Sequence, residues 1–143
     1  MSLKLYFSPG ACSFVPHSLL QLTGASFEPI MVKLHKGEQN GDEYKAINPR
    51  GQVPVLIDNG QVITQILAII LYLDQKFPAC QFLPTEPVAR AKAIETLAWM
   101  NNTIHPTFTH IFMPHKFSDQ ADVQANLKVF NTQIYKGLLS ELE

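Results

Sequence analysis

The stretch YFSPGACSFVPH, residues 6–17, places Cys12 at the point where an apolar strand pattern gives way to a helical one. The unpaired N–H groups and the macrodipole at the first turn of a helix favour an anion, so a Cys12 thiolate would be stabilised there. Cys12 is then suited to act as a nucleophile or as a partner for another sulfur atom. The alternative is that Cys12 serves as a small buried apolar residue.

The chain has one other cysteine, Cys80, which lies far from Cys12 in the sequence. A dithiol oxidoreductase needs a second cysteine three residues after the first, and Val15 occupies that position. The spacing of the two cysteines matches no metal-binding motif, so we expect no metal site. A reduced, cytoplasmic protein is the simplest interpretation of so few cysteines.

The composition of the 143-residue chain is that of an ordinary folded protein, with 46% hydrophobic and 16% charged residues. It holds 11 basic and 12 acidic residues for a net charge of −1, with no cluster of lysine and arginine, which argues against a nucleic-acid partner. The longest apolar run, residues 66–73, is too short to span a membrane. The N-terminus lacks the long apolar stretch of a secretory signal.

The N-terminal part of the chain shows the pattern of an α/β fold. The pair Asn59-Gly60 between two apolar runs is the strongest short-range signal for a β-hairpin. Gly24 is a natural helix stop, and Pro29 indicates an edge strand because it lacks an N–H. The expected elements are a strand over 3–7, a helix over 12–23, a strand over 27–34, hairpin strands over 54–57 and 61–63, and a helix over 65–77. This order is βαβ followed by a hairpin and a helix.

The C-terminal part shows no strand pattern and is expected to be helical. Residues 78–87 contain three prolines, which is typical of a linker. Apolar residues then recur every three or four positions over 94–112, which predicts one long amphipathic helix. Pro106 removes a backbone donor within it and should kink the helix near Asn102. Asp119 is the expected N-cap of a second helix that runs to about residue 142.

Three segments carry a family resemblance: LYFSPGACS at 5–13, AINPRGQVPVLIDNGQVIT at 46–64 and AIILYL at 68–73. In these the chain resembles the cytosolic glutathione S-transferases, most closely the bacterial beta class. The resemblance implies a thioredoxin-like glutathione-binding domain over 1–78, a linker over 79–87 and an all-α domain over 88–143. Glutathione would be the co-substrate, bound at the junction of the two domains. Beside family members the helical domain looks truncated.

The resemblance also implies a cis bond between Val53 and Pro54. Such a turn would leave the N–H and C=O of Val53 facing outward, where a peptide-like ligand can pair with them as a short strand. Gln52, just before this turn, would contact the glycyl end of glutathione. Lys36, in the loop after the second strand, would reach one of its carboxylates.

Gln65 and Ile66 stand where the family usually has an acidic residue followed by Ser, Thr or Gly. By resemblance, this helix N-terminus would bind the γ-glutamyl carboxylate through backbone N–H groups. Gln65 lacks the charge that would hold the ligand's ammonium group, and Ile66 lacks a hydroxyl, so we expect weaker affinity for glutathione. His105 is placed by the resemblance near the glutathione sulfur, where an imidazole could exchange a proton at neutral pH.

Three functions remain open on this basis. The leading hypothesis is a glutathione S-transferase in which glutathione thiolate attacks a small electrophile, or in which Cys12 reduces a substrate through a mixed disulfide, with Cys12 and His105 as the catalytic residues. The alternative, favoured by Gln65 and Ile66, is a non-catalytic relative with a binding or regulatory role. The third is a monothiol glutaredoxin-like reductase that depends on Cys12.

The expected assembly is a homodimer. The apolar faces of residues 94–112 and 123–142 would be exposed if nothing covered them. We therefore expect a partner subunit, or chain outside this sequence, to cover both faces.

Overall fold

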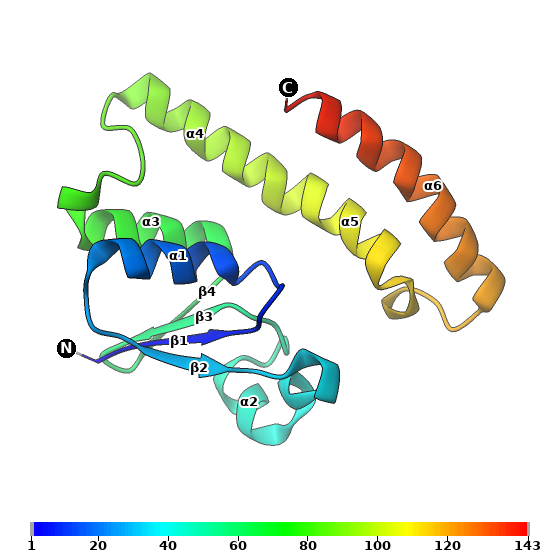
Figure 1. The fold of residues 1–143 in the computed structure, drawn as a ribbon, viewed down its shortest axis with the longest axis horizontal. Coiled ribbons are helices and arrows are strands. Elements are labelled where there is room, and N and C mark those ends of the chain that lie inside the picture. The colour runs from blue at the N-terminus through cyan, green and yellow to red at the C-terminus, as the bar shows by residue number, and fades with distance from the viewer. Residues whose placement is uncertain (1, 143) are drawn as a thin grey trace. The chain divides into compact units, whose positions relative to one another are not determined.

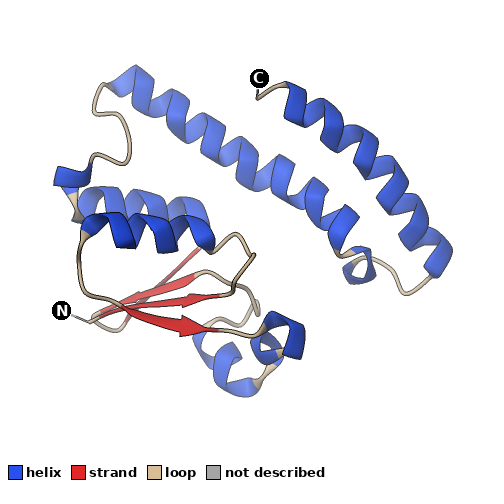
Figure 2. Ribbon diagram, in the orientation of Figure 1, coloured by secondary structure: helices blue, strands red, loops and turns tan. Residues whose placement is uncertain are grey.

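The computed structural model describes residues 2–142, and its contacts divide the chain into a unit that ends at Arg90 and one that begins at Ala91. The first unit is built on a four-stranded sheet with the order β2-β1-β3-β4 (Figure 2). Its strands are β1 (Leu3–Phe7), β2 (Glu28–Met31), β3 (Val55–Asp58) and β4 (Gln61–Thr64). β1 pairs in parallel with β2 and antiparallel with β3, and β3 pairs antiparallel with β4. The thioredoxin-like order expected from the sequence is thus confirmed.

Two helices, α1 (Phe14–Thr23) and α3 (Ile66–Lys76), lie side by side on one face of this sheet (Figure 1). The core between helices and sheet is apolar and fully enclosed, and its fully buried members are Leu5, Leu20, Leu56, Ile69 and Leu73. Alternate residues of the strands face the opposite side, where α2 (Asp42–Ile47) packs. There Val32, Tyr44 and Val55 form a second buried cluster. Because successive side chains of a strand point to opposite faces, the one sheet contributes apolar residues to both cores.

The hairpin turn forms where the sequence predicts it. Asp58 pairs with Gln61, so the loop between them is the two residues Asn59 and Gly60. Both have positive φ, 48° and 84°, which is the type I′ geometry that Asn-Gly favours. The stop at Gly24 is also confirmed, since it caps α1 in the left-handed region.

In the first unit, two boundaries differ from those expected by more than one residue. α1 begins at Phe14 and not at Cys12, because the chain from Ser8 to Ser13 is still folded as turns. β2 is only four residues long: after Val32, whose N–H donates to Phe7 O at 2.7 Å, the chain enters the 3₁₀ turns Leu34–Lys36 and Glu38–Asn40. The edge position of β2, which Pro29 indicates, is confirmed.

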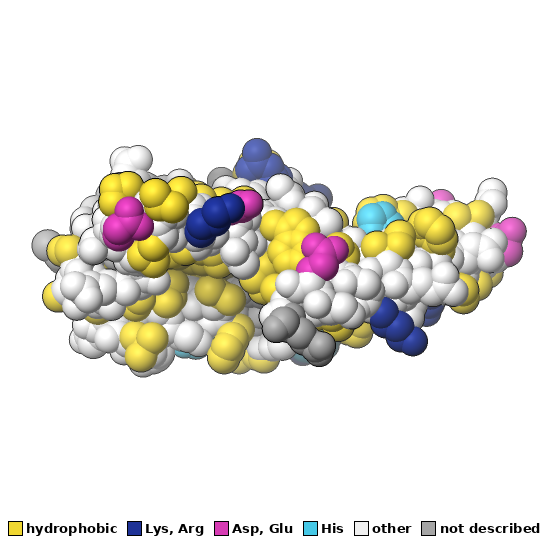
Figure 3. Space-filling view, turned by 90° about the horizontal axis from the view of Figure 1, so that it is seen from above, with side chains coloured by type: hydrophobic (Ala, Val, Ile, Leu, Met, Phe, Trp, Pro, Cys, Tyr) yellow, Lys and Arg dark blue, Asp and Glu magenta, His cyan; other side chains and the backbone are white. Residues whose placement is uncertain are grey.

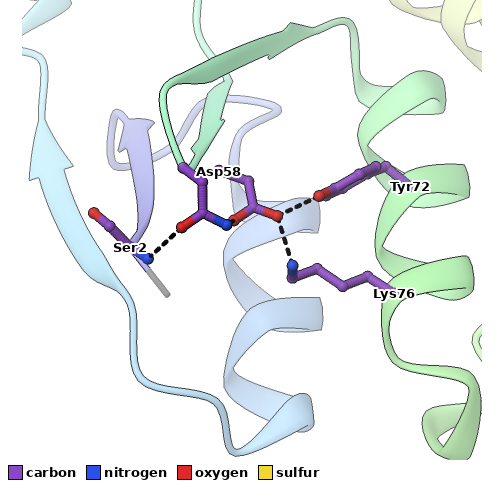
Figure 4. Close-up of polar contacts among 5 residues, drawn as sticks. Ser2, Asp58, Tyr72 and Lys76 are labelled. Carbon is purple, nitrogen blue, oxygen red and sulfur yellow. Dashed lines mark hydrogen bonds and ion pairs between the residues drawn. The ribbon is translucent and has the colours of Figure 1, made fainter.

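A buried polar group joins the sheet to α3 (Figure 4). Asp58 is 4% exposed and accepts hydrogen bonds from the Tyr72 hydroxyl and from Lys76 Nζ, the latter at 2.6 Å. Its other oxygen accepts from Asn59 Nδ2, and Asn59 in turn accepts from the Ser2 N–H. Hydrogen bonds from Lys76 and Tyr72 lower the pKa of Asp58. The carboxylate is therefore ionised and satisfied in spite of its burial.

Hydrogen bonds to Asp74, near the end of α3, hold the segment that follows this helix. This segment contains the 3₁₀ turn Pro78–Cys80. Asp74 Oδ1 accepts from the Leu83 N–H at 3.0 Å, and Asp74 Oδ2 accepts from Arg90 Nη1 at 2.8 Å. These bonds give the proline-rich segment a defined path.

The helical part begins with α4 (Pro87–Trp99) and continues without a break. Met100–Ile104 is a π-helical segment, followed by α5 (His105–Phe112). Pro106 has no N–H to give to the Asn102 carbonyl, and the His105 N–H bonds to Met100 O, five residues back. The disturbance expected near Asn102 thus takes the form of a π-helical segment within the helix.

The second unit closes with the 3₁₀ turn Pro114–Lys116 and α6 (Ala121–Ser140). The N-cap of α6 is Gln120, so the expected cap at Asp119 is wrong by one position. α5 and α6 pack through Phe108 and Tyr135, whose ring centroids are 5.5 Å apart. Other large side chains remain open to solvent, including Phe112 at 69% and Phe130 at 65% exposed.

Hydrophobic side chains also gather in patches between scattered charges on the face shown in Figure 3. None of the helices in residues 2–142 combines the length and the apolar character that a membrane crossing requires.

Candidate functional site

The loop between β1 and α1, which carries Cys12, is held by a residue that sequence analysis did not single out. Ser13 is fully buried, and its hydroxyl both donates to Ser8 O at 3.1 Å and accepts from Ser8 N–H at 3.0 Å. Gly10 within the loop has φ 72°, a conformation that suits glycine. The loop is thus closed on itself, and this closure fixes the place of Cys12.

The Cys12 thiol is half-buried and faces the turn before β3. Its Sγ lies 3.7 Å from the Val53 carbonyl oxygen, which accepts its hydrogen bond. Burial raises the pKa of Cys12 above its ordinary value, and the backbone N–H groups of Cys12 and Ser13 counteract this only in part. In this structure Cys12 is therefore a protonated thiol at neutral pH. The N–H groups at the start of the helix stabilise its thiolate, as expected, but burial outweighs them.

The Val53–Pro54 bond is cis, as the resemblance implies. The two polar groups of Val53 differ in their surroundings. Its C=O faces Cys12, whereas its N–H donates to no residue that the structure describes. The N–H is therefore free for a ligand, and the C=O, whose oxygen has two lone pairs, accepts one bond from Cys12 and can accept another.

The turn before Val53 is supported from α2. Tyr44 Oη and Asn48 Nδ2 both donate to the Gln52 carbonyl, at 2.8 and 2.7 Å. Gly51 has φ 60°, and a Cβ there would lie 2.9 Å from Gln39 O, so only glycine fits. Gln52 itself has an exposed side chain, as a ligand contact requires.

The N-terminus of α3 is open. Gln65, its N-cap, is exposed, has φ 72° and makes no side-chain capping bond. Its carbonyl accepts from the Ile69 N–H, so the first helical N–H groups, from Ile66 onward, have no partner within the helix. A positive φ at a non-glycine residue is strained, which is common at functional sites. An open helix N-terminus of this kind suits a carboxylate.

The strand registers bring these features to the same end of the sheet. Tyr6 pairs with Val55, and Val55 pairs with Thr64. The end of β1, the start of β3 and the end of β4 therefore meet. The residues gathered at this end are Cys12, Gln52, Val53, Pro54, Gln65 and Ile66.

The two remaining candidates lie elsewhere along the chain. Lys36 is exposed and is the last residue of the first 3₁₀ turn after β2. The last residue of β2, Met31, pairs with Phe7 at the same end of the sheet. His105 is the first residue of α5 in the second unit; its side chain is exposed, and its carbonyl accepts from Thr109 Oγ1 at 2.9 Å.

Three residues that support the site through hydrogen bonds to its backbone were not predicted from the sequence: Ser13, Tyr44 and Asn48. Asn48 gives a local signal, because Asn-Pro initiates turns and its Oδ1 accepts from the Arg50 N–H at 3.2 Å. Ser13 and Tyr44 give none, since their partners are set by the folded loop.

Comparisons with known proteins agree with this architecture. The family model for the N-terminal domain of glutathione S-transferases matches residues 1–75. The glutathione S-transferase GstA of Escherichia coli O157:H7 is 37% identical over 137 residues, which cover 90% of this chain and 68% of that protein. The fold is that of a thioredoxin-like domain followed by helices, and the chain belongs to the glutathione S-transferase family.

Solved structures give the same result. A sphingomonad glutathione S-transferase complexed with glutathione is 33% identical, with a TM-score of 0.80 over 97% of this chain and 67% of that one. The bacterial beta class enzyme of Sphingomonas chungbukensis is 32% identical, with a TM-score of 0.81 and the same coverage. The resemblance seen in the sequence is confirmed. The chain spans between 51% and 68% of the length of the first curated relatives it matches.

Proposed function

We propose that the protein binds glutathione and conjugates its thiolate to a small electrophile. The observation that carries the proposal is the meeting of Cys12, the free Val53 N–H and the open N-terminus of α3 at one end of the sheet. The N–H of Val53 pairs with the ligand main chain, and the N–H groups of Ile66 and its neighbours take the γ-glutamyl carboxylate. The solved sphingomonad relative, which holds glutathione, supports this assignment.

The state of Cys12 favours conjugation over a mixed disulfide. When glutathione binds, the protonated Cys12 thiol exchanges its hydrogen bond to the Val53 carbonyl for one to the glutathione sulfur, and this bond favours the thiolate form of the ligand. That thiolate attacks the electrophile and a carbon–sulfur bond forms. In a substitution the bond to the leaving group breaks and its electron pair departs with that group; in an addition the π electrons move to the electron-withdrawing substituent, and a proton from water completes the product. Attack by Cys12 itself would first require its deprotonation, which burial opposes. His105 assists by exchanging a proton with the glutathione sulfur.

Two further contacts complete the proposed site. Gln52 contacts the glycyl end of glutathione, and Lys36 attracts one of its carboxylates; both side chains are exposed.

The proposed glutathione-binding domain covers residues 1–78, the linker residues 79–87 and the helical domain residues 88–143. The proposed assembly is a homodimer in the cytoplasm.

A non-catalytic binding role is the second candidate. Gln65 and Ile66 favour it, because neither supplies a charge or a hydroxyl to the ligand. Turnover separates the two candidates: a transferase consumes a model electrophile with glutathione, whereas a binding protein holds glutathione without turnover. A monothiol reductase would instead show disulfide exchange that disappears in Cys12→Ser.

The test is a calorimetric titration of glutathione into the wild type beside Cys12→Ser. Binding in both proteins, weaker in the variant, is expected, because serine keeps a donor but offers a poorer contact to sulfur. Turnover of an aryl halide with glutathione is then measured on the same samples. Absence of binding at millimolar glutathione in the wild type would refute the proposal.

A further inference from the structure

The peptide bond between Gln52 and Val53 is held from one side only. Tyr44 Oη and Asn48 Nδ2 both donate to the Gln52 carbonyl oxygen, at 2.8 and 2.7 Å. The two donors are buried, with Tyr44 7% and Asn48 2% exposed. The carbonyl cannot turn away without losing both bonds and leaving two buried donors unpaired.

Fixing this carbonyl also fixes the N–H of Val53. The Gln52–Val53 bond is trans, since Val53–Pro54 is the one cis bond within residues 2–142. In a planar trans peptide the C=O and the N–H point in opposite directions. The carbonyl is directed at Tyr44 and Asn48, so the N–H is directed away from them, and it donates to no described residue.

We propose that Tyr44 and Asn48 are positioning residues for glutathione: by holding the Gln52 carbonyl they aim the Val53 N–H at the main chain of the ligand. Neither side chain touches the ligand. The inference rests on the proposed function, since it names how that site is pre-organised. A donor held in place before binding costs no ordering when the ligand arrives, which raises affinity.

The chemistry of Tyr44 suits this role. Burial, together with the nearby Tyr6, raises the pKa of Tyr44 to about 12, so its hydroxyl stays a donor throughout the neutral range. The Tyr44 ring packs edge-on against the Tyr6 ring, with centroids 5.8 Å apart. Replacing Tyr44 by phenylalanine removes the hydroxyl and keeps this packing.

The experiment compares Tyr44→Phe with Tyr6→Phe. Tyr6 belongs to the same cluster, but its hydroxyl makes no hydrogen bond to any described residue, so it is the matched control. We expect Tyr44→Phe to raise the glutathione dissociation constant about fivefold, the effect of one weakened neutral hydrogen bond, and Tyr6→Phe to leave it unchanged. In turnover the KM for glutathione rises by the same factor, while kcat at saturating glutathione stays within about twofold.

A second variant and a spectroscopic measurement keep the proposal testable if one of the variants does not fold. Asn48→Ser removes the amide group that donates the other hydrogen bond to the Gln52 carbonyl. The double variant Tyr44→Phe, Asn48→Ser should weaken glutathione binding by more than either single change. The ¹³C resonance of the Gln52 carbonyl, followed by NMR in ligand-free protein, should move upfield in Tyr44→Phe and stay in place in Tyr6→Phe. Unchanged affinity in folded Tyr44→Phe and Asn48→Ser would overturn the positioning role.

Failure of the proposed function gives a different result. If the wild type binds no glutathione, the proposed function is refuted, and so is the claim that the Val53 N–H is aimed at glutathione. The carbonyl resonance still decides whether Tyr44 holds the Gln52–Val53 peptide, because it is measured without ligand. A resonance that does not move in Tyr44→Phe would overturn that part as well.

Discussion

Cys12 shows how much the environment of one side chain decides its chemistry. Its expected place at the first turn of a helix suggests a thiolate, but its Sγ is half-buried and faces the Val53 carbonyl. A carbonyl oxygen accepts from a thiol and repels a thiolate, and burial also disfavours the charge. The residue is therefore better suited to donate to the sulfur of a bound ligand than to attack.

This gives a prediction for the alkylation of Cys12. The rate of its reaction with iodoacetamide follows the thiolate fraction, so the midpoint of the rate against pH should lie above that of a cysteine in an unfolded peptide, as its raised pKa requires. The reaction of Cys12→Ser, which retains Cys80, is subtracted as background. A midpoint below that of the peptide would show that the thiolate is stabilised after all.

The missing charge at Gln65 gives a second prediction. Gln65→Glu should lower the glutathione dissociation constant about fivefold, because a charge-assisted bond to the ligand's ammonium group replaces a neutral one. Calorimetry measures the change. Gln61→Glu is the control, since it adds the same charge at the opposite end of β4. Equal effects of the two substitutions would mean that the charge acts at long range and not at the site.

At the scale of elements, the site depends on how β1 is joined to α1. The Ser8–Ser13 bonds close this loop, and the pairing of β1 with β3 then brings Cys12 to Val53. Neither contact is local to the helix or the strand that it positions. The geometry of the site is therefore tied to the stability of the loop.

Ser13→Ala should lower the free energy of unfolding by about 1–3 kcal/mol, because it leaves the buried N–H of Ser8 without its partner. The Ser8 carbonyl loses one of its two bonds and keeps the one from the Ala11 N–H. Urea unfolding measures this. Ser18→Ala is the control: its hydroxyl donates to Phe14 O on an exposed turn of α1, and we expect a change within about 0.5 kcal/mol. Similar losses in both variants would refute the role of Ser13.

The junction of β3 and α3 makes stability depend on pH. The pKa of Asp58 is lowered in the folded state, so its contribution is present above the unfolded value of about 4 and is lost as the pH falls through the folded value. Asp58→Asn should cost roughly 1–3 kcal/mol at pH 7 and flatten the fall in stability below pH 4. Urea titrations from pH 2 to pH 7 test this. An equally steep acid limb in Asp58→Asn would assign the loss to other groups.

For the molecule as a whole, burial is unequal between the two units. Among the residues that the structure describes, the buried hydrophobic side chains belong to the first unit with the exception of Ile104. In the second unit, Phe112, Val129 and Phe130 are each at least 65% exposed. Stability should therefore reside mainly in the sheet and in the helices that cover it.

Hydrogen exchange followed by NMR or mass spectrometry tests this distribution. In dilute samples, where the proposed homodimer is dissociated, we expect the slowest amides in β1, β3 and α3, which surround the fully buried core, and the fastest helical amides in α6. Local opening of α6 exposes little additional apolar surface, so it costs little free energy. Exchange in α6 as slow as in β1 would show that this helix is covered in solution.

The order of the elements, the Asn59-Gly60 hairpin, the stop at Gly24 and the edge position of Pro29 could all be predicted from the amino-acid sequence. The order of the elements follows from the apolar patterns along the chain, and the other three follow from backbone preferences of one or two residues. The sequence also placed a disturbance at Pro106, where a missing N–H acts locally. The family motifs added the cis bond before Pro54.

Three features could not be predicted without the folded structure: the protonation state of Cys12, the burial of Asp58, and the hydrogen bonds from Tyr44 and Asn48 to the Gln52 carbonyl. These features depend on burial and on hydrogen-bond partners, which come from residues far apart in the chain. Cys12 meets Val53 only because β1 pairs with β3, and no local pattern at Cys12 contains that pairing. The same pairing, through burial, sets its pKa.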